Sequence, residues 1–262
     1  ACRVLIGEHQ DEMTRSLFFF VCAALLMACR TDEPVKPRTA ASTLRIEVRP
    51  EWNGQPLQRY TPYIAPHGYR FQVEFLKMYL SDLRLVSATG ESTMEQVRLL
   101  DLGNGPFQFD LQVPVGNWLG MRAGIGLPHD LNYTNAALYG DEHPMSVNNG
   151  MYWSWATGYK FVLFDGRYDP DPNGTGPLLS TFSVHTGMDT CFTTAELFPA
   201  LPFGTEKDVT TKLVLRIAVD HFLATPQDTI NVTTENQSHG GNYPLALKLT
   251  RNVRRSMALE VL

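Results

Sequence analysis

The sequence contains little cysteine and no surplus of basic charge. Only 4 of its 262 residues are Cys, and 22 Lys+Arg stand against 27 Asp+Glu, so the formal net charge is −5. A protein that binds nucleic acid through its phosphates needs a basic stripe, and the composition excludes that class. No Cys-x-x-Cys pair occurs, so a structural zinc site of that kind is not expected.

Motifs of the common enzyme classes are also missing. The chain has no Gly-x-Ser-x-Gly elbow, no Walker loop and no His-Glu-x-x-His motif. Residues 169–180 resemble the first half of an EF-hand loop, but Ser180 stands where calcium needs a bidentate Glu. We therefore predict a hairpin loop at this place and no enzymatic activity for the protein.

The apolar run near the start of the chain is short. Residues 17–27 provide about eleven apolar residues, whereas a helix that spans a bilayer needs about twenty. The run follows Met13-Thr14-Arg15 and ends at Leu26-Met27-Ala28-Cys29, which resembles a bacterial lipobox. The alternative is a buried amphipathic helix, but the run is apolar all round. We predict a signal peptide at residues 13–28 and a lipid on Cys29.

The predicted leader sets the expected organisation of the chain. Residues 1–12 would be a non-native upstream segment, and residues 29–42, with two prolines, would be a lipid-anchored tether. The protein would lie in the periplasm or at the cell surface, attached to a bacterial membrane through its lipid alone. Cys191 would be the only thiol of the mature domain, which excludes an intramolecular disulfide there.

Residues 43–262 carry the period-two pattern of strands. Apolar and polar residues alternate in several segments, and clusters of turn residues lie between them. The sequence therefore predicts a single all-β domain, a two-sheet β-sandwich. Further expectations are a strand through Leu245, Leu247 and Leu249, no helix with an apolar stripe of three turns, and turns at residues 103–106 and at Asp165-Gly166.

Residues 149–161 contain an unusual group of aromatic residues. In an extended strand Met151, Trp153 and Trp155 would share one face. Two neighbouring tryptophans bury a large area, so the simplest interpretation is that they anchor a core.

His185 lies in a second segment of interest. Ser183 and His185 share one face of the expected strand, opposite Phe182 and Val184. Because the apolar pair would face the core, His185 is expected on the other side, or in a site that this side lines.

These two segments carry a family resemblance. Residues 149–161, Asn-Gly-Met-Tyr-Trp-Ser-Trp-Ala-Thr-Gly-Tyr-Lys-Phe, followed by Phe182-Ser-Val-His185-Thr-Gly187, resemble the MbnP-like family of methanobactin-associated periplasmic copper-binding proteins and their lipoprotein relatives. Residues 78–85 and 124–128 support the resemblance. It implies an exported β-sandwich that binds copper. In some members a partner dihaem enzyme oxidises a tryptophan to kynurenine, which joins the metal site.

The resemblance assigns roles to individual residues. Trp153 and Trp155 match the paired tryptophans, which makes them the candidates for oxidation, and His185 matches the histidine of the His-x-Gly block. Cys191 falls where members with four cysteines place one of theirs. Its partners are missing here, so the disulfide frame of that subgroup is absent.

The residue types themselves suit copper, because imidazole binds it in either oxidation state and thioether sulfur favours Cu(I). For each histidine the alternative is an ordinary surface or hydrogen-bonded residue. The candidate ligands, in order, are His185, His129 and His143, with Met188 and Met145 as sulfur donors. His221 is expected at the end of the core, and His67 and His239 are undecided.

The sequence leaves more than one function open. The leading hypothesis is a non-catalytic, lipid-anchored copper-binding protein for copper uptake, storage or handover, whose partner is a dihaem tryptophan-oxidising enzyme or a copper transport protein. The alternative is a glycan- or protein-binding β-sandwich module, in which exposed aromatics such as Trp153 stack on the ligand. A purely structural envelope protein is the third.

Overall fold

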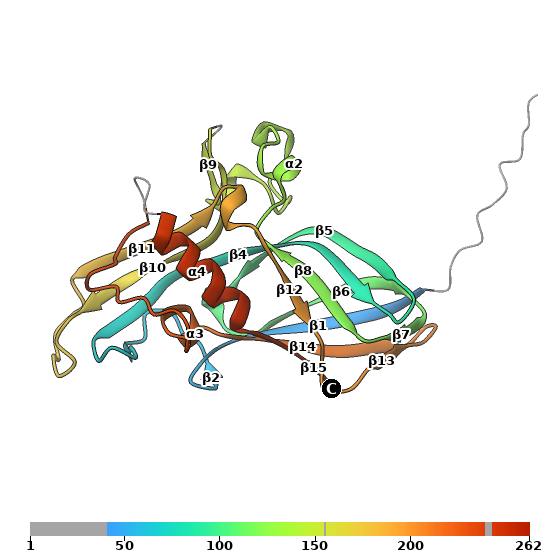
Figure 1. Ribbon diagram of the computed structural model, residues 1–262, viewed down its shortest axis with the longest axis horizontal. Coiled ribbons are helices and arrows are strands. Elements are labelled where there is room, and N and C mark those ends of the chain that lie inside the picture. The colour runs from blue at the N-terminus through green and yellow to red at the C-terminus, as the bar shows by residue number, and fades with distance from the viewer. Residues whose placement is uncertain (1–40, 155, 239–242) are drawn as a thin grey trace, which may run out of the picture. The chain divides into compact units, whose positions relative to one another are not determined.

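The computed structural model describes residues 41–154, 156–238 and 243–262 (Figure 1). The described residues cluster as one compact unit. The predicted upstream segment, signal peptide, lipidated Cys29 and most of the tether lie outside the described residues, as do Trp155 and His239. Strand β1 begins at Ala41, inside the segment assigned to the tether. Among the described residues, no helix combines the length and the apolar character needed to cross a membrane.

The smaller of the two main sheets is built on β1, whose alternating residues Leu44, Ile46 and Val48 are fully buried. This alternation puts one face of the strand against the core, as the period-two pattern predicts. Strand β14 pairs with β1 in parallel, and the other pairs in the sheet are antiparallel. The sheet consists of β1 (Ala41–Trp52), β2 (Gln55–Pro56), β6 (Phe107–Pro114), β14 (Thr210–Ala218) and β15 (Met257–Val261).

The larger sheet is organised around the 17-residue strand β4 (Arg70–Val86). Its main path runs β11 (Ser180–Gly187), β10 (Gly158–Asp169), β4, β8 (Gly120–Ile125) and β12 (Thr193–Leu197). Strands β3 (Tyr63–Ile64), β5 (Glu91–Asp101) and β9 (Tyr152–Ser154) pair beside this path, and β7 (Gly116–Trp118) pairs with β13 (Phe203–Thr205) in a separate small sheet. Apolar residues of the two main sheets form one core between them. The predicted all-β, two-sheet sandwich is confirmed.

The outer face of the larger sheet is covered as well. Tyr79, Phe161 and Leu163 point to the side opposite Met78 and Val162, and they form a second hydrophobic cluster with side chains from residues 127–151. The short helical segments of the domain lie in its connections: η1 (Leu102–Asn104), α2 (His129–Asn132), η2 (Ala136–Leu138), η3 (Val147–Asn149), η4 (Asp189–Cys191) and α3 (Asp220–Leu223). Cys191 is buried in the second cluster and forms no disulfide with a described residue.

The expected strand through Leu245, Leu247 and Leu249 is wrong, because these residues belong to helix α4 (Tyr243–Arg255). The helix also overturns the expectation that no helix carries a three-turn apolar stripe. Leu245, Leu249 and Val253 are spaced by four residues and are buried together in the main core. The alternation of the leucines was incidental to this longer period. Helix α4 packs along β11 and also contacts β12, the two end strands of the larger sheet's main path (Figure 1).

The predicted turn at Asp165-Gly166 is also wrong. Both residues lie inside β10, where the pairing with β4 shifts by one residue between them. Gly166 is needed for a close approach rather than for a turn, since an added Cβ would overlap the backbone oxygen of Gln72 and lie 2.8 Å from the Phe182 ring. The expected loops are present at residues 103–106 and between β10 and β11.

His221 does not lie at the end of the core as expected. Strand β14 ends at Ala218, and the chain turns into α3, which directs the His221 side chain to solvent with 48% of it exposed. Its nearest acidic group is Asp220, at 3.8 Å. His67 is exposed in a turn before β4.

We expect Gly166→Ala to destabilise the fold by about 1–3 kcal/mol, because the methyl group has to displace the backbone of β4. Gly176→Ala is the matched control, since nothing lies within 4 Å of its added Cβ. Urea unfolding of both variants measures the difference. Equal midpoints for the two variants would contradict the close approach.

Candidate functional site

A pocket of about 170 Å³ lies on the outer face of the larger sheet, at the end of β11. Strand β11 provides His185, β9 provides Trp153, and α4 provides part of the opposite wall. The lining residues are Trp153, Thr157, His185, Gly187, Met188, Ser238, Tyr243 and Ala246. The structure therefore brings two predicted ligands, His185 and Met188, together with one predicted tryptophan.

The His185 ring is nearly buried, with 5% of its side chain exposed, and it pairs with an acidic group. Its Nε2 lies 2.7 Å from Oδ1 of Asp165 and 3.2 Å from Oγ of Ser183. The three residues share the outer face because Leu163 pairs with His185, and Asp165 with Ser183, across β10 and β11. A buried imidazole held by a carboxylate has a fixed ring orientation.

The backbone of His185 is held just as firmly. Its N–H donates to Oγ of Ser238 at 2.8 Å, and the same hydroxyl donates to the His185 carbonyl at 2.7 Å. Residues 236–238 run beside β11, where Gln237 bridges to Ser183. One serine therefore fixes both backbone polar groups of the histidine, which leaves the residue little room to move.

Trp153 borders the pocket instead of anchoring a core. Trp153 is 42% exposed to solvent. Its ring meets the His185 ring edge to face, at a centroid distance of 6.0 Å. The expectation that Met151 shares its face is wrong, because Met151 is fully buried in the second cluster. Met151 lies before β9, directly after Gly150 at a φ of 72°, so strand alternation does not yet apply there.

Met188 occupies a strained position at the pocket. Its φ is 63°, a left-handed conformation that costs a non-glycine residue about 1–3 kcal/mol. The Tyr243 hydroxyl donates to its sulfur, with Oη and Sδ 3.6 Å apart. Non-glycine strain of this kind concentrates at functional sites, so the backbone supports a role for Met188.

The loop that leads to β9 is held by two buried tyrosines. The Tyr79 hydroxyl donates to the Pro144 carbonyl and the Tyr159 hydroxyl to the Met145 carbonyl, each at 2.8 Å. Burial raises the pKa of both phenols, that of Tyr159 to about 12, so both remain donors at neutral pH. The Lys160 ammonium, whose pKa burial lowers, donates to the Gly150 carbonyl. These bonds place Trp153 over His185.

The other predicted ligands lie in different surroundings. Met145 is fully buried in the second cluster, and Nδ1 of His143 accepts the N–H of Met145 while its ring stacks on Tyr139. His129 is exposed and bonds through Nδ1 to Asp189, at 2.7 Å. None of the three lines the pocket, and the described part of the chain holds no group of three or more His, Cys, Asp or Glu placed to bind a metal.

Three important residues of the site were not found from the sequence. The sequence predicts a turn at Asp165 and a strand in the region where Tyr243 begins helix α4, and Ser238 carries no signal of its own. For Asp165 a signal did exist, since strand alternation from Val162 and Phe164 places it on the outer face with His185.

Asp189→Asn should lower the pKa of His129, because the hydrogen bond to Asp189 is the main cause that raises it. Because folding raises the pKa of His129, protonation of its ring stabilises the folded state at pH values below the pKa in the unfolded chain. This contribution is lost as the pH rises through the pKa in the folded protein. An NMR titration of the ring protons measures the shift. Asp130→Asn is the control and should lower the pKa of His129 less, since the charge of Asp130 contributes least to the raised pKa. Equal shifts in the two variants would contradict Asp189 as the main cause.

Comparison with known proteins places the chain in a family. The MbnP family model matches residues 41–241, well over half of the chain. Among solved structures, MbnP from Methylosinus trichosporium matches at 16% sequence identity and a TM-score of 0.43, over 70% of this chain and 77% of that one. No curated protein matches the chain. On the family model's coverage, which confirms the resemblance seen in the sequence, this chain belongs to the MbnP family.

Proposed function

We propose that the protein binds copper, without catalysis, in the pocket of His185, Met188 and Trp153. The donors suit this metal, since an imidazole nitrogen and a thioether sulfur together favour copper, and Cu(I) in particular, over Mg²⁺ or Ca²⁺. None of the described lining residues is a carboxylate, which disfavours the hard cations further.

The pairing of His185 with Asp165 is the observation that carries the proposal. Histidines that bind metals almost always give their second ring nitrogen to a carboxylate or carbonyl, which fixes the ring and raises its basicity. Here the Asp165 carboxylate holds Nε2 at 2.7 Å, in the way that such a carboxylate orients a metal-binding ring.

The location, role and partners that we propose rest on the sequence predictions. A lipid on Cys29 would hold the protein at the bacterial envelope, facing the periplasm or the cell surface, and it would take up, store or hand over copper. Trp153, exposed beside His185, is accessible to a dihaem tryptophan-oxidising partner, and Trp155 remains the second candidate. A copper transport protein is the other partner that this role would require.

His185→Ala should abolish retention of copper, because it removes the imidazole donor. The measurement is copper per protein by elemental mass spectrometry after loading with Cu(I) and dialysis, and we expect near one equivalent for the unmodified protein and none for the variant. The matched control is His221→Ala, which removes an exposed histidine outside the pocket and should retain the full equivalent.

A second variant separates ligand loss from misfolding. Asp165→Asn keeps the shape of the partner but not its charge, and it should weaken copper binding by about 10–100-fold while the fold is retained. Unchanged affinity in both pocket variants would overturn the proposal. Quenching of tryptophan fluorescence by oligosaccharides but not by copper would support the glycan-binding alternative instead.

A further inference from the structure

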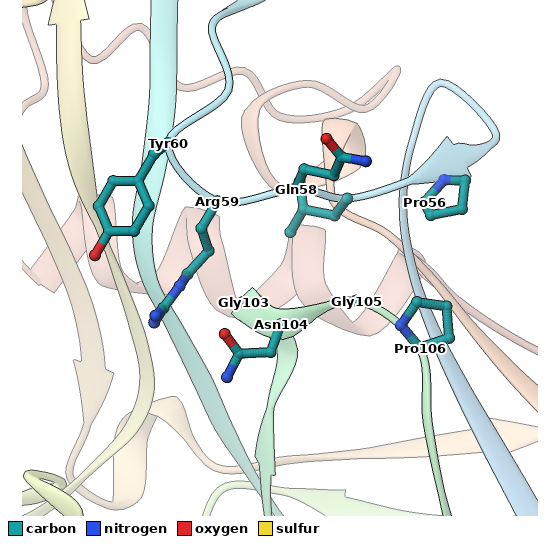
Figure 2. Close-up of a pocket in the computed structure, with 9 residues that line it drawn as sticks. Pro56, Gln58, Arg59, Tyr60, Gly103, Asn104, Gly105 and Pro106 are labelled. Carbon is teal, nitrogen blue, oxygen red and sulfur yellow. The ribbon is translucent and has the colours of Figure 1, made fainter.

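A second and larger cavity, of about 420 Å³, lies elsewhere on the domain and is not used by the proposed copper site. It is formed between the connection from β2 to β3 and the loop after η1, as Figure 2 shows. Its size is within the range of pockets that bind small molecules. The lining residues are Pro56, Leu57, Gln58, Arg59, Tyr60, Gly103, Asn104, Gly105 and Pro106.

Among the described residues of this lining, Arg59 is the only ionisable cation, and none is an Asp or Glu. The other arginines that the structure describes all pair with a carboxylate, except Arg254 on the exposed side of α4. Arg59 therefore differs from nearly all other described arginines, because its guanidinium lies in a pocket and has no carboxylate partner. Its fork of N–H donors matches a carboxylate in two hydrogen bonds.

The arginine is held in place by its surroundings. The Cζ atom of its guanidinium lies over the rings of Tyr60, at 5.4 Å, and Phe75, at 5.8 Å, and these contacts use none of its N–H groups as donors to a carboxylate. Its aliphatic stem lies against Gly103, where an added Cβ would overlap Cδ of Arg59. Tyr60 itself is fixed at a φ of 60° by the bond from its N–H to the Val73 carbonyl. A side chain fixed in this way loses little entropy when it binds.

The other lining residues indicate the chemistry of the part of the ligand that does not contact Arg59. Figure 2 shows Arg59 and Asn104 at one end and the rings of Pro56 and Pro106 at the other, so a charged group and an apolar body would be placed side by side. The amides of Gln58 and Asn104 add neutral donors. One positive charge balances one negative charge, which favours a carboxylate over a phosphate dianion.

We propose that this cavity binds a small monocarboxylic acid with an apolar ring, through two hydrogen bonds from Arg59. The site is separate from the copper pocket, because the two share no lining residue. The inference is therefore independent of the proposed function, and copper binding in the pocket of His185 should be unaffected by the acid.

The test is an NMR titration of the purified protein with benzoate. We expect a Kd on the order of millimolar, as suits a ligand of this size, with amide shifts at residues 56–60 and 103–106. Benzamide lacks the charge and acetate lacks the ring, so both should bind at least about tenfold more weakly. Tighter binding of inorganic phosphate than of benzoate, or shifts confined to other residues, would overturn the proposal.

Variants locate the interaction. Arg59→Gln should abolish benzoate binding. Arg254→Gln, which removes the other described arginine without a carboxylate partner, should leave it unchanged. Gly103→Ala keeps the charge but displaces the Arg59 stem, so it should weaken binding several-fold. Because the backbone spectrum reports the fold of each variant directly, unchanged benzoate binding by a folded Arg59→Gln protein would refute the assignment.

Discussion

The larger sheet has to bury both of its faces, and the rest of the structure depends on this requirement. Its central strand β4 carries four successive buried residues from Met78 to Ser81, which no strand with one solvated face could contain. The inner face is covered by the smaller sheet. The outer face needs a second layer, because residues such as Tyr79 and Phe161 each stabilise the fold by about 1.5–3 kcal/mol only when they are buried. Residues 127–151 supply most of that layer, and helix α4 adds Ala246 and Leu247 to it.

The pocket at His185 lies at the edge of that second layer, between Trp153 and helix α4. Covered by Trp153 and α4, the histidine is withdrawn from water while its ring keeps a carboxylate partner. A polar pair in such surroundings interacts more strongly than it would at an exposed surface. The same layer buries Met145 and engages His143 with Tyr139, which removes both from the pocket. The burial of the outer face thus determines which of the candidate copper ligands line the pocket.

Sequence patterns predicted the fold class and part of the site. The alternation of apolar and polar residues predicted the strands of the sandwich and placed His185 away from the core, because period two is a property of the strand itself. The failures occurred where tertiary packing decides. Asp165-Gly166 has the composition of a turn; the alternation from Phe164 continues through Asp165, but the need for Gly166 arises only from the close approach of β4. Leu245, Leu247 and Leu249 alternate by chance, and Ala246 and Val253 reveal the helix only once their buried face is known. Ser238 reaches the pocket from a segment more than fifty residues after His185, and no local pattern connects the two.

The central claim is that His185 and Met188 bind one copper ion together. X-ray absorption at the copper edge, on protein loaded with one equivalent of Cu(I), measures this most directly. The account predicts scattering from an imidazole nitrogen and from one thioether sulfur, and loss of the sulfur signal in Met188→Leu. A spectrum with nitrogen and oxygen neighbours alone, identical in the two proteins, would contradict it.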